Sequence, residues 1–324
     1  MLITFFSSIS PYTNATFFSF FVVLIRRLFS LFHVVKTGLY IDELQILVFI
    51  SLSCSGAIIG SFLLLKRMMM FANAISHTIL FGLVIVALFS GDILHLSIFN
   101  LIISSVITTI FTGLLIRTIS DFFHIKEDAS IAFIFSFLFA LSLILLVYLS
   151  KSTHVGTELV LGNADALTIK DLQYVSYVLL INLLIVTFLF RGFLIYSFDV
   201  LYSKALGFSP TLFGYILLLQ TSLSLVSAFK AVGVLLSLSF LIIPVITAKL
   251  FAKSVKWLIF LSMIFGCLGS ILGTALSRHV LTQIGVGLSS GGLISLVLIF
   301  IYSCAFFLNY LRNFFIRSRK LREN

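Results

Sequence analysis

The chain has 324 residues, of which 60% are hydrophobic and only 10% are charged, and its formal net charge is +10. A soluble domain carries about 25% charged residues, so this composition does not suit a surface covered by water. The basic residues lie between apolar runs and in the tail that holds Arg312, Arg317, Arg319, Lys320 and Arg322. This is the distribution of basic residues in membrane proteins, and it argues against nucleic acid as a partner.

Three cysteines, Cys54, Cys267 and Cys304, each lie inside an apolar run. They are odd in number, far apart and without C-x-x-C spacing, so they indicate neither a disulfide framework nor a thiolate metal site. The N-terminus has no Lys or Arg before Arg26 and does not resemble a cleaved signal peptide.

Residues 1–41 form an N-terminal segment whose apolar run, from Phe17 to Phe32, is interrupted by Arg26 and Arg27. This run is either a span with a basic end or an amphipathic helix in the membrane interface, and we favour the span.

The rest of the chain predicts nine further membrane-spanning helices, because each run is apolar and long enough to cross about 30 Å of hydrocarbon. The expected spans are 44–66, 70–90, 96–117, 129–149, 172–195, 210–228, 231–250, 256–276 and 284–308. Basic residues at alternate ends place Lys66 and Arg117 inside. The sequence therefore predicts an all-α, polytopic membrane helix bundle, with a transmembrane domain over 42–310 and a basic cytoplasmic tail over 311–324.

Small residues recur at a spacing of four within these spans, at Gly56 with Gly60 and at Gly269 with Gly273. This spacing predicts helices whose backbones approach closely, since van der Waals packing replaces the hydrophobic driving force in lipid.

A polar trio lies near the start of the second of these spans. Asn73 and His77 are four residues apart and share one helix face, with Ser76 beside them. From a start near Met70, His77 lies about 10 Å into the membrane. At that depth the trio faces protein or a water-filled path. Two interpretations stay open: ligands for a transported ion, or a histidine that hydrogen-bonds to a neighbouring helix.

The segment Phe198–Pro210 predicts a short cytoplasmic helix of its own. Asp199 is suited to its N-cap and Gly207 to the position after its end, while Ser209 and Pro210 open the next span.

Leu201, Ala205 and Phe208 would give this short helix an apolar stripe. Such a stripe at the surface needs a partner. The alternative is a connector that packs on its own bundle.

The longest polar stretch, Ser150 to Gln173, is expected on the outside. Its His154, Glu158 and Asp165 are metal-ligand types, but we interpret them as solvated loop residues. Thr168 and Asp171 have the spacing of a capping box for the span that follows.

Three ordered blocks resemble the membrane permease subunits of bacterial ABC importers for zinc, manganese or iron. They are the small-residue helix with Lys66-Arg67 and Ala72-Asn73-Ala74-Ile75-Ser76-His77-Thr78, the Phe198-Asp199…Ala205-x-Gly207 pattern, and the span at 231–248 with Pro244. Together they extend over roughly 45–300. Family members commonly have an Asp where this chain has Asn73.

The resemblance implies a transported divalent metal with His77, Asn73 and Ser76 as ligands, and no tightly bound cofactor. It implies contact with a cytoplasmic ABC ATPase through Phe198, Asp199, Leu201, Ala205 and Gly207. The other implied partners are an extracytoplasmic metal-binding protein, a second permease copy or paralogue, and membrane lipid. The implied location is the bacterial cytoplasmic membrane.

This chain contains no G-x-x-x-x-G-K-[ST], so ATP would bind to another chain, and the protein is not expected to be an enzyme. A membrane-embedded enzyme is further disfavoured because His77 has no second histidine in an H-E-x-x-H arrangement. An ion-coupled secondary transporter is the alternative function. It would need buried acidic or basic relays, whereas nearly all Asp and Glu, including Asp42 and Glu43, are expected in loops. Ligand type does not choose among the metals.

Overall fold

A computed structural model describes residues 12, 16–30, 40–90, 98–150, 164–285 and 288–323. Every helix or strand element in these ranges is an α-helix. The helices are α2 (Phe17–Ser30), α3 (Ile41–Lys66), α4 (Met69–Ser90), α5 (Ile98–Phe123), α6 (Glu127–Ser150), α8 (Ile169–Phe198), α9 (Val200–Ala205), α10 (Pro210–Val232), α11 (Val234–Lys249), α12 (Val255–Ile284) and α13 (Ser290–Glu323). Among the described residues, eight helices are long and apolar enough to cross a membrane, and α11 is a shorter apolar helix. The polytopic helical bundle is confirmed.

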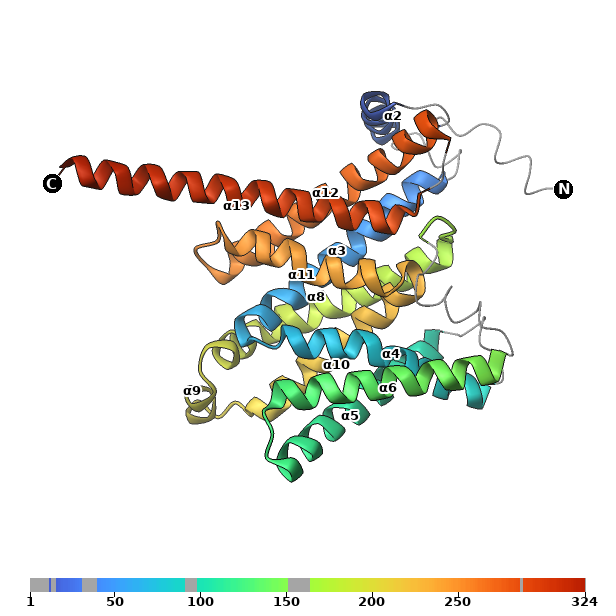
Figure 1. Cartoon of the computed structure of the whole chain (residues 1–324), viewed down its shortest axis with the longest axis vertical. Helices are drawn as coiled ribbons and strands as arrows, with labels where there is room; N and C mark the ends of the chain where they lie inside the picture. Colours follow the sequence, from blue (N-terminus) through green and yellow to red (C-terminus); the bar gives the residue numbers. More distant parts are fainter. Residues whose placement is uncertain are drawn as a thin grey trace.

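The turns between the helices gather at two ends of the bundle (Figure 1). The α3–α4 turn, α9 and the α11–α12 turn lie at one end, which the basic residues assign to the cytoplasm. Helix α13 continues beyond this end as one helix of 34 residues. Its length is about 51 Å, against a hydrocarbon core of about 30 Å. The predicted basic tail is therefore a helical extension of the last span.

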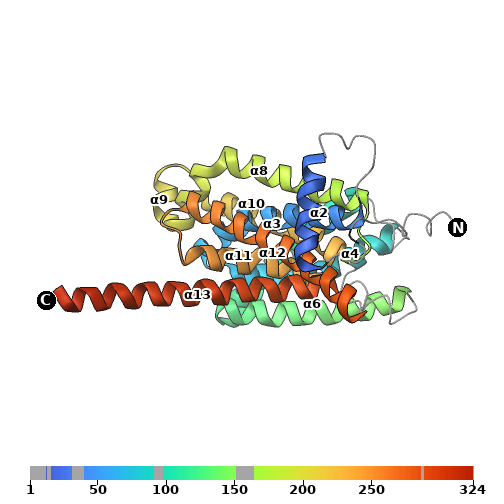
Figure 2. The same ribbon diagram turned by 90° about the horizontal axis from the view of Figure 1, so that it is seen from above.

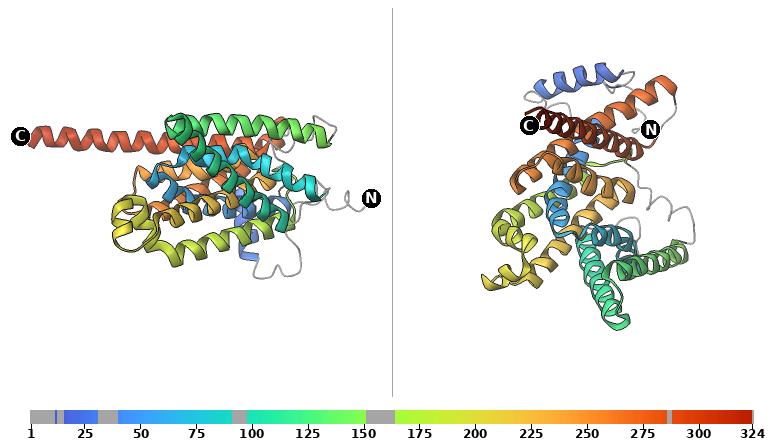
Figure 3. Two further views of the ribbon diagram at one scale, coloured as in Figure 1. Left: turned by 90° about the horizontal axis from the view of Figure 1, so that it is seen from below. Right: turned by 60° about the vertical axis from the view of Figure 1, so that its left-hand side comes forward.

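The helices divide into two flanks with a centre between them (Figure 3). Helices α4, α5 and α6 pack on one another and form one flank, while α12 and α13 pair on the opposite flank. Helix α3 runs through the centre, where it contacts α8, α10, α11 and α12. The predicted polar trio on α4 therefore lies on the α4–α6 flank.

Small residues bring the central helices together, as their spacing predicted. A Cβ atom at Gly56 of α3 would lie 2.9 Å from the carbonyl oxygen of Phe240 in α11, and one at Gly60 would overlap the same helix. Gly269 and Gly273 of α12 face side chains of α13 in the same way. Substitution at these glycines would force the helices apart.

A buried polar cluster joins three central helices. The Asn182 side-chain amide of α8 donates hydrogen bonds to Ser55 Oγ of α3, at 2.9 Å, and to Ser224 Oγ of α10, at 2.6 Å. The two serine hydroxyls lie 3.0 Å apart. Hydrogen bonds between membrane helices contribute about 0.6 to 2 kcal/mol each, a modest amount because the separated helices also find polar partners.

Two helices end later in the chain than expected. Helix α10 continues to Val232 rather than 228, because the first residue that turns the chain is Gly233, at φ +85°. Helix α12 continues from 276 to Ile284 and ends at Gly285, at φ +70°. In each case the helix runs to a glycine that adopts the left-handed region at little cost.

Helix α2 lies across the bundle rather than along it (Figure 2). Its 14 residues are about 21 Å long, less than the hydrocarbon core. Phe20 is buried against α3 and α12, whereas Phe18, Val22 and Ile25 form an exposed apolar stripe. These features favour the interfacial alternative over the span that the sequence favoured. The division of the chain into three parts stays a prediction.

Candidate functional site

The turn between α3 and α4 is made without glycine or proline. Arg67 adopts the left-handed region, at φ 62°, and its N–H donates to the carbonyl of Leu64. The Met68 N–H donates to the carbonyl of Leu63, which completes the cap of α3. Helix α4 then begins at Met69.

This start places His77 eight residues along α4, about 12 Å from the helix start. The His77 ring stacks on Phe135, with 5.5 Å between ring centroids, and meets the edge of Phe139 at 5.4 Å. Both phenylalanines belong to α6. His77 is half-buried, as is Asn73 one turn before it.

The three predicted ligands differ in their hydrogen bonds. Ser76 is buried, and its hydroxyl donates to the backbone carbonyl of Asn73 at 2.7 Å. Within the described part of the chain, no hydrogen bond is made by the imidazole of His77 or the side-chain amide of Asn73. The alternative of a histidine bonded to a neighbouring helix therefore finds no partner among the described side chains.

The described residues do not bring together a complete metal site. They contain no group of three or more His, Cys, Asp or Glu side chains placed to hold one ion. Asn73 and His77 present two side chains on one helix that could ligate a metal and make no hydrogen bond within the described residues, whereas the Ser76 hydroxyl is bonded to the backbone carbonyl of Asn73. Their role as ligands stays a prediction. His154 and Glu158 lie outside the described residues.

The short helix α9 forms as predicted, at the end assigned to the cytoplasm. Asp199 Oδ1 accepts hydrogen bonds from the N–H groups of Leu201 and Tyr202, at 2.8 and 3.1 Å. At the other end Gly207, at φ +81°, donates to the carbonyl of Lys204. The predicted N-cap and terminal glycine are both confirmed.

The surface of α9 is largely apolar and unpartnered by the described bundle. Leu201 is 77% exposed and Phe198, just before the helix, is 67% exposed; Ala205 is exposed as well. The predicted third member of the stripe, Phe208, is only half-exposed. The turn at Gly207 returns Phe208 to the bundle, where its ring packs on Phe213 at 5.8 Å.

A basic side chain links this region to the start of α4. Lys66, the last residue of α3, donates from Nζ to the backbone carbonyl of Tyr196 at 3.2 Å and lies 4.2 Å from the centre of its ring. Tyr196 precedes Asp199, the cap of α9, by three residues, and Lys66 precedes α4 by three. The sequence showed Lys66 only as a marker of sidedness.

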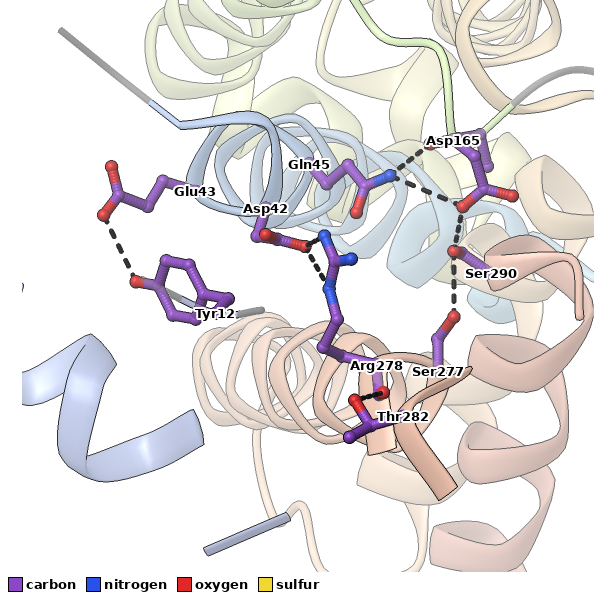
Figure 4. Close-up of polar contacts among 10 residues, drawn as sticks. Tyr12, Asp42, Glu43, Gln45, Asp165, Ser277, Arg278, Thr282 and Ser290 are labelled. Carbon is purple, nitrogen blue, oxygen red and sulfur yellow. Dashed lines mark hydrogen bonds and ion pairs between the residues drawn. The ribbon is translucent and has the colours of Figure 1, made fainter. Parts of the chain in front are cut away.

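The opposite end of the bundle carries a polar network (Figure 4). Asp42, in the first turn of α3, is buried and accepts two hydrogen bonds from Arg278 of α12. The neighbouring Glu43 accepts from Arg27 Nε at 2.8 Å and from the hydroxyl of Tyr12 at 3.2 Å. Burial, followed by the charge of Glu43, raises the pKa of Tyr12, so its hydroxyl keeps the proton that it donates.

The same network reaches the segment before α8. Gln45 donates to the carbonyl of Ala164 at 3.1 Å and to Asp165 Oδ1 at 3.4 Å, and Ser290 donates to the same carboxylate. A cavity of about 370 Å³ lies beside these groups. Asp165 was expected to be solvated, and it is exposed. Its carboxylate nevertheless accepts hydrogen bonds from Gln45 of α3 and Ser290 of α13, and so joins the two helices.

Asp42 and Glu43 were expected in a loop, and the structure shows them inside α3 as partners of two arginines. Arg27 is 16 residues from Glu43, and Arg278 is 236 residues from Asp42. The sequence signal that could have found them is the pair of adjacent carboxylates opening an apolar run. Two adjacent charges there need counter-charges from elsewhere in the fold.

The described residues hold eight helices that are long and apolar enough to cross a membrane, and the shorter apolar helix α11. With the capped short helix at one end and the polar network at the other, they define a multi-pass membrane protein. The chain matches the family model described as the ABC 3 transport family over residues 43–309. It is 46% identical over 321 residues to a probable metal transport system membrane protein of Chlamydia muridarum, covering 98% of this chain and 99% of that protein.

A second relative is the manganese transport system membrane protein MntC of Halalkalibacterium halodurans, 30% identical over 250 residues, which are 77% of this chain and 81% of the relative. Among solved structures, PsaBC from Streptococcus pneumoniae in complex with Fab matches with a TM-score of 0.72 at 28% identity, over 83% of this chain and 92% of that chain. The chain belongs to the ABC 3 transport family and is a multi-pass protein of the bacterial inner membrane.

Proposed function

We propose that this chain is the permease subunit of an ABC importer that moves a divalent transition metal inward, driven by ATP hydrolysis on a partner subunit. Relatives named for metal and for manganese transport are similar to it over most of its length. The observation that carries the metal path is the pair of donors on α4. Asn73 and His77 are half-buried within a span. Within the described part of the chain, the Asn73 side-chain amide and the His77 imidazole make no hydrogen bond.

The chemistry of these donors suits passage rather than storage. A neutral imidazole and an amide oxygen replace part of the hydration shell of the metal, and a weakly held ion can leave again. Metal ions in proteins take four or more ligands, so two donors from one chain leave room for water or for a second permease copy. A dimer of permeases would supply four such donors. Manganese is the first metal to test, because of the named relative.

Helix α9 is the proposed contact with the ATPase. A capped helix with exposed apolar side chains at the cytoplasmic end needs a partner that covers it. The ATP site resides on that partner, since the sequence of this chain lacks the phosphate-binding loop. The outer end, with the Asp165 network, is the proposed docking face for an extracytoplasmic metal-binding protein. We propose no tightly bound cofactor, because the metal is the substrate.

The test is ATP-driven uptake in proteoliposomes that contain this chain and its ATPase, with the extracytoplasmic metal-binding protein added outside. Labelled manganese, zinc and iron are offered separately. Uptake of one of these metals should require ATP on the side of the ATPase and should vanish with a hydrolysis-deficient ATPase. Uptake that an ion gradient drives without ATP would instead support the secondary transporter and overturn the proposal.

A further inference from the structure

Helices α3 and α12 pack antiparallel along one seam that crosses the membrane. At its outer end Asp42 of α3 meets Arg278 of α12. Further along the seam Ser53 faces Gly266, and the next residues, Cys54 and Cys267, face each other. From the first contact to the last, the residue number increases from 42 to 54 along α3 and decreases from 278 to 267 along α12. The three contacts therefore follow one antiparallel register.

The two thiols are in contact. Cys54 Sγ and Cys267 Sγ lie 3.9 Å apart, and both side chains are free thiols. Gly266 allows this approach, because a Cβ atom there would overlap the hydroxyl of Ser53. A disulfide requires an S–S distance of about 2.05 Å, so the sulfur atoms must close by about 1.8 Å. Rotation about the two Cα–Cβ bonds is the motion that brings the sulfur atoms closer together.

The position of the pair limits what can reach it. Cys54 lies 13 residues along α3 and Cys267 lies 12 residues along α12, about 20 and 18 Å from the helix starts. Both are therefore near mid-span, and each is partly exposed. A reagent must partition into lipid to reach them. Neither thiol belongs to the proposed metal path, which lies on the α4–α6 flank.

We propose that Cys54 and Cys267 form a dithiol–disulfide pair that a lipid-soluble oxidant closes, tying α3 to α12. Each thiol gives up one proton and one electron, and the two sulfur atoms join. A quinone accepts both electrons and both protons and becomes a quinol. With a copper(II) chelate, two copper(II) ions each accept one electron and become copper(I), and the two protons pass to solvent. The alternative is a purely structural role, in which both cysteines act as small apolar residues that pack between α3 and α12.

The test counts thiols in the full chain, reconstituted in liposomes and treated with copper(II)–phenanthroline. The protein is then denatured, alkylated and mapped by mass spectrometry. Alkylated cysteines should fall from three to one, Cys304, and the peptides that hold Cys54 and Cys267 should be joined within one chain. Reduction should restore all three.

Cys304→Ser is the matched control, since Cys304 lies exposed on α13. This variant should lose both remaining thiols on oxidation, whereas Cys54→Ser and Cys267→Ser should each keep the unpaired seam thiol. Three alkylatable cysteines after oxidation of the original chain would overturn the proposal, as would a link through Cys304 to a second chain. The result for the unmodified chain decides the question even if a variant fails to fold.

Discussion

His77 is the residue on which the proposed path depends most. His77→Ala should lower metal uptake at least about tenfold, because ligand removal costs at least as much as loss of a ligand's own supporting partner. His77→Phe is the matched control for packing, since it keeps an aromatic ring beside Phe135 and Phe139. Uptake should fall in both variants. The thermal midpoint and ATPase co-purification should hold in His77→Phe.

A structural histidine would give the opposite pattern. His77→Ala would then lower thermal stability and uptake together, and His77→Gln would restore both by supplying a polar group. Normal uptake by His77→Ala would remove this residue from the path.

Asn73 carries a second prediction, because the amide is a neutral ligand. Asn73→Asp should keep uptake at neutral pH but make it fall more steeply as the pH decreases, since a carboxylate must lose its proton to bind metal. Initial rates measured over a pH series, with manganese and zinc in parallel, check the expectation. Parallel pH profiles in the two proteins would contradict it.

Caps were predictable from the sequence, and ion pairs were not. Asp199, Gly207 and Thr168 act within three residues of their partners, so local spacing was enough to place them. Asp42 is held by an arginine 236 residues away, and no local pattern shows such a partner. Asn73 and His77 of α4 are an intermediate case. Their spacing placed them on one helix face, but it could not show that their side chains would lack hydrogen bonds.

At the scale of single elements, α9 is the part that should couple to the ATPase. Gly207→Val forces a branched residue to φ +81°, and Ala205→Glu adds a charge to the exposed apolar surface. Each variant should lower co-purification of the ATPase about tenfold while the protein stays in the membrane. Gly285→Val is the matched control, because Gly285 has φ +70° but lies at the outer end. It should leave ATPase binding intact.

The link between α3 and α8 should affect coupling without affecting docking. Lys66→Met keeps an unbranched side chain of similar length. It removes the hydrogen bond to the Tyr196 carbonyl and the contact of the ammonium group with the Tyr196 ring. We expect the ATPase to bind normally and the metal transported per ATP hydrolysed to fall several-fold. Loss of ATPase binding along with transport would instead assign Lys66 to the docking surface.

The sequence was sufficient to predict that the helices exist, but not where each helix ends or which helices become neighbours. Apolar length was sufficient to predict eight helices that can span a membrane and the shorter helix α11. Helices α10 and α12 nevertheless continue to Gly233 and Gly285, because no earlier residue ends them. The cluster of Ser55, Asn182 and Ser224 depends on which helices become neighbours. That choice is made by packing over the whole bundle.

For the whole molecule, the outer network should contribute to stability. Asp42 is 2% exposed, so Asp42→Asn leaves Arg278 without its counter-charge and should cost about 3 kcal/mol. Arg278→Gln should cost a similar amount, and the double variant less than the sum of the two. Thermal unfolding in one detergent measures all three. Additive losses would show that the two groups do not stabilise each other.

The orientation of the bundle in the membrane ties the proposed roles together, because the ATPase and the metal-binding protein must meet opposite ends. Lys204 belongs to α9 and Ala166 lies three residues before the start of α8, and both are exposed. Helix α9 and the start of α8 lie at opposite ends of the bundle (Figure 1). In a chain whose three cysteines are replaced by serine, Ala166→Cys should react with an impermeant maleimide in intact cells. Lys204→Cys should react only after the membrane is opened, since the basic residues keep its end inside. Each variant should first be shown to support metal uptake, so that labelling reports the native orientation. Labelling of position 204 but not 166 would reverse the bundle, and α9 could then not meet a cytoplasmic ATPase.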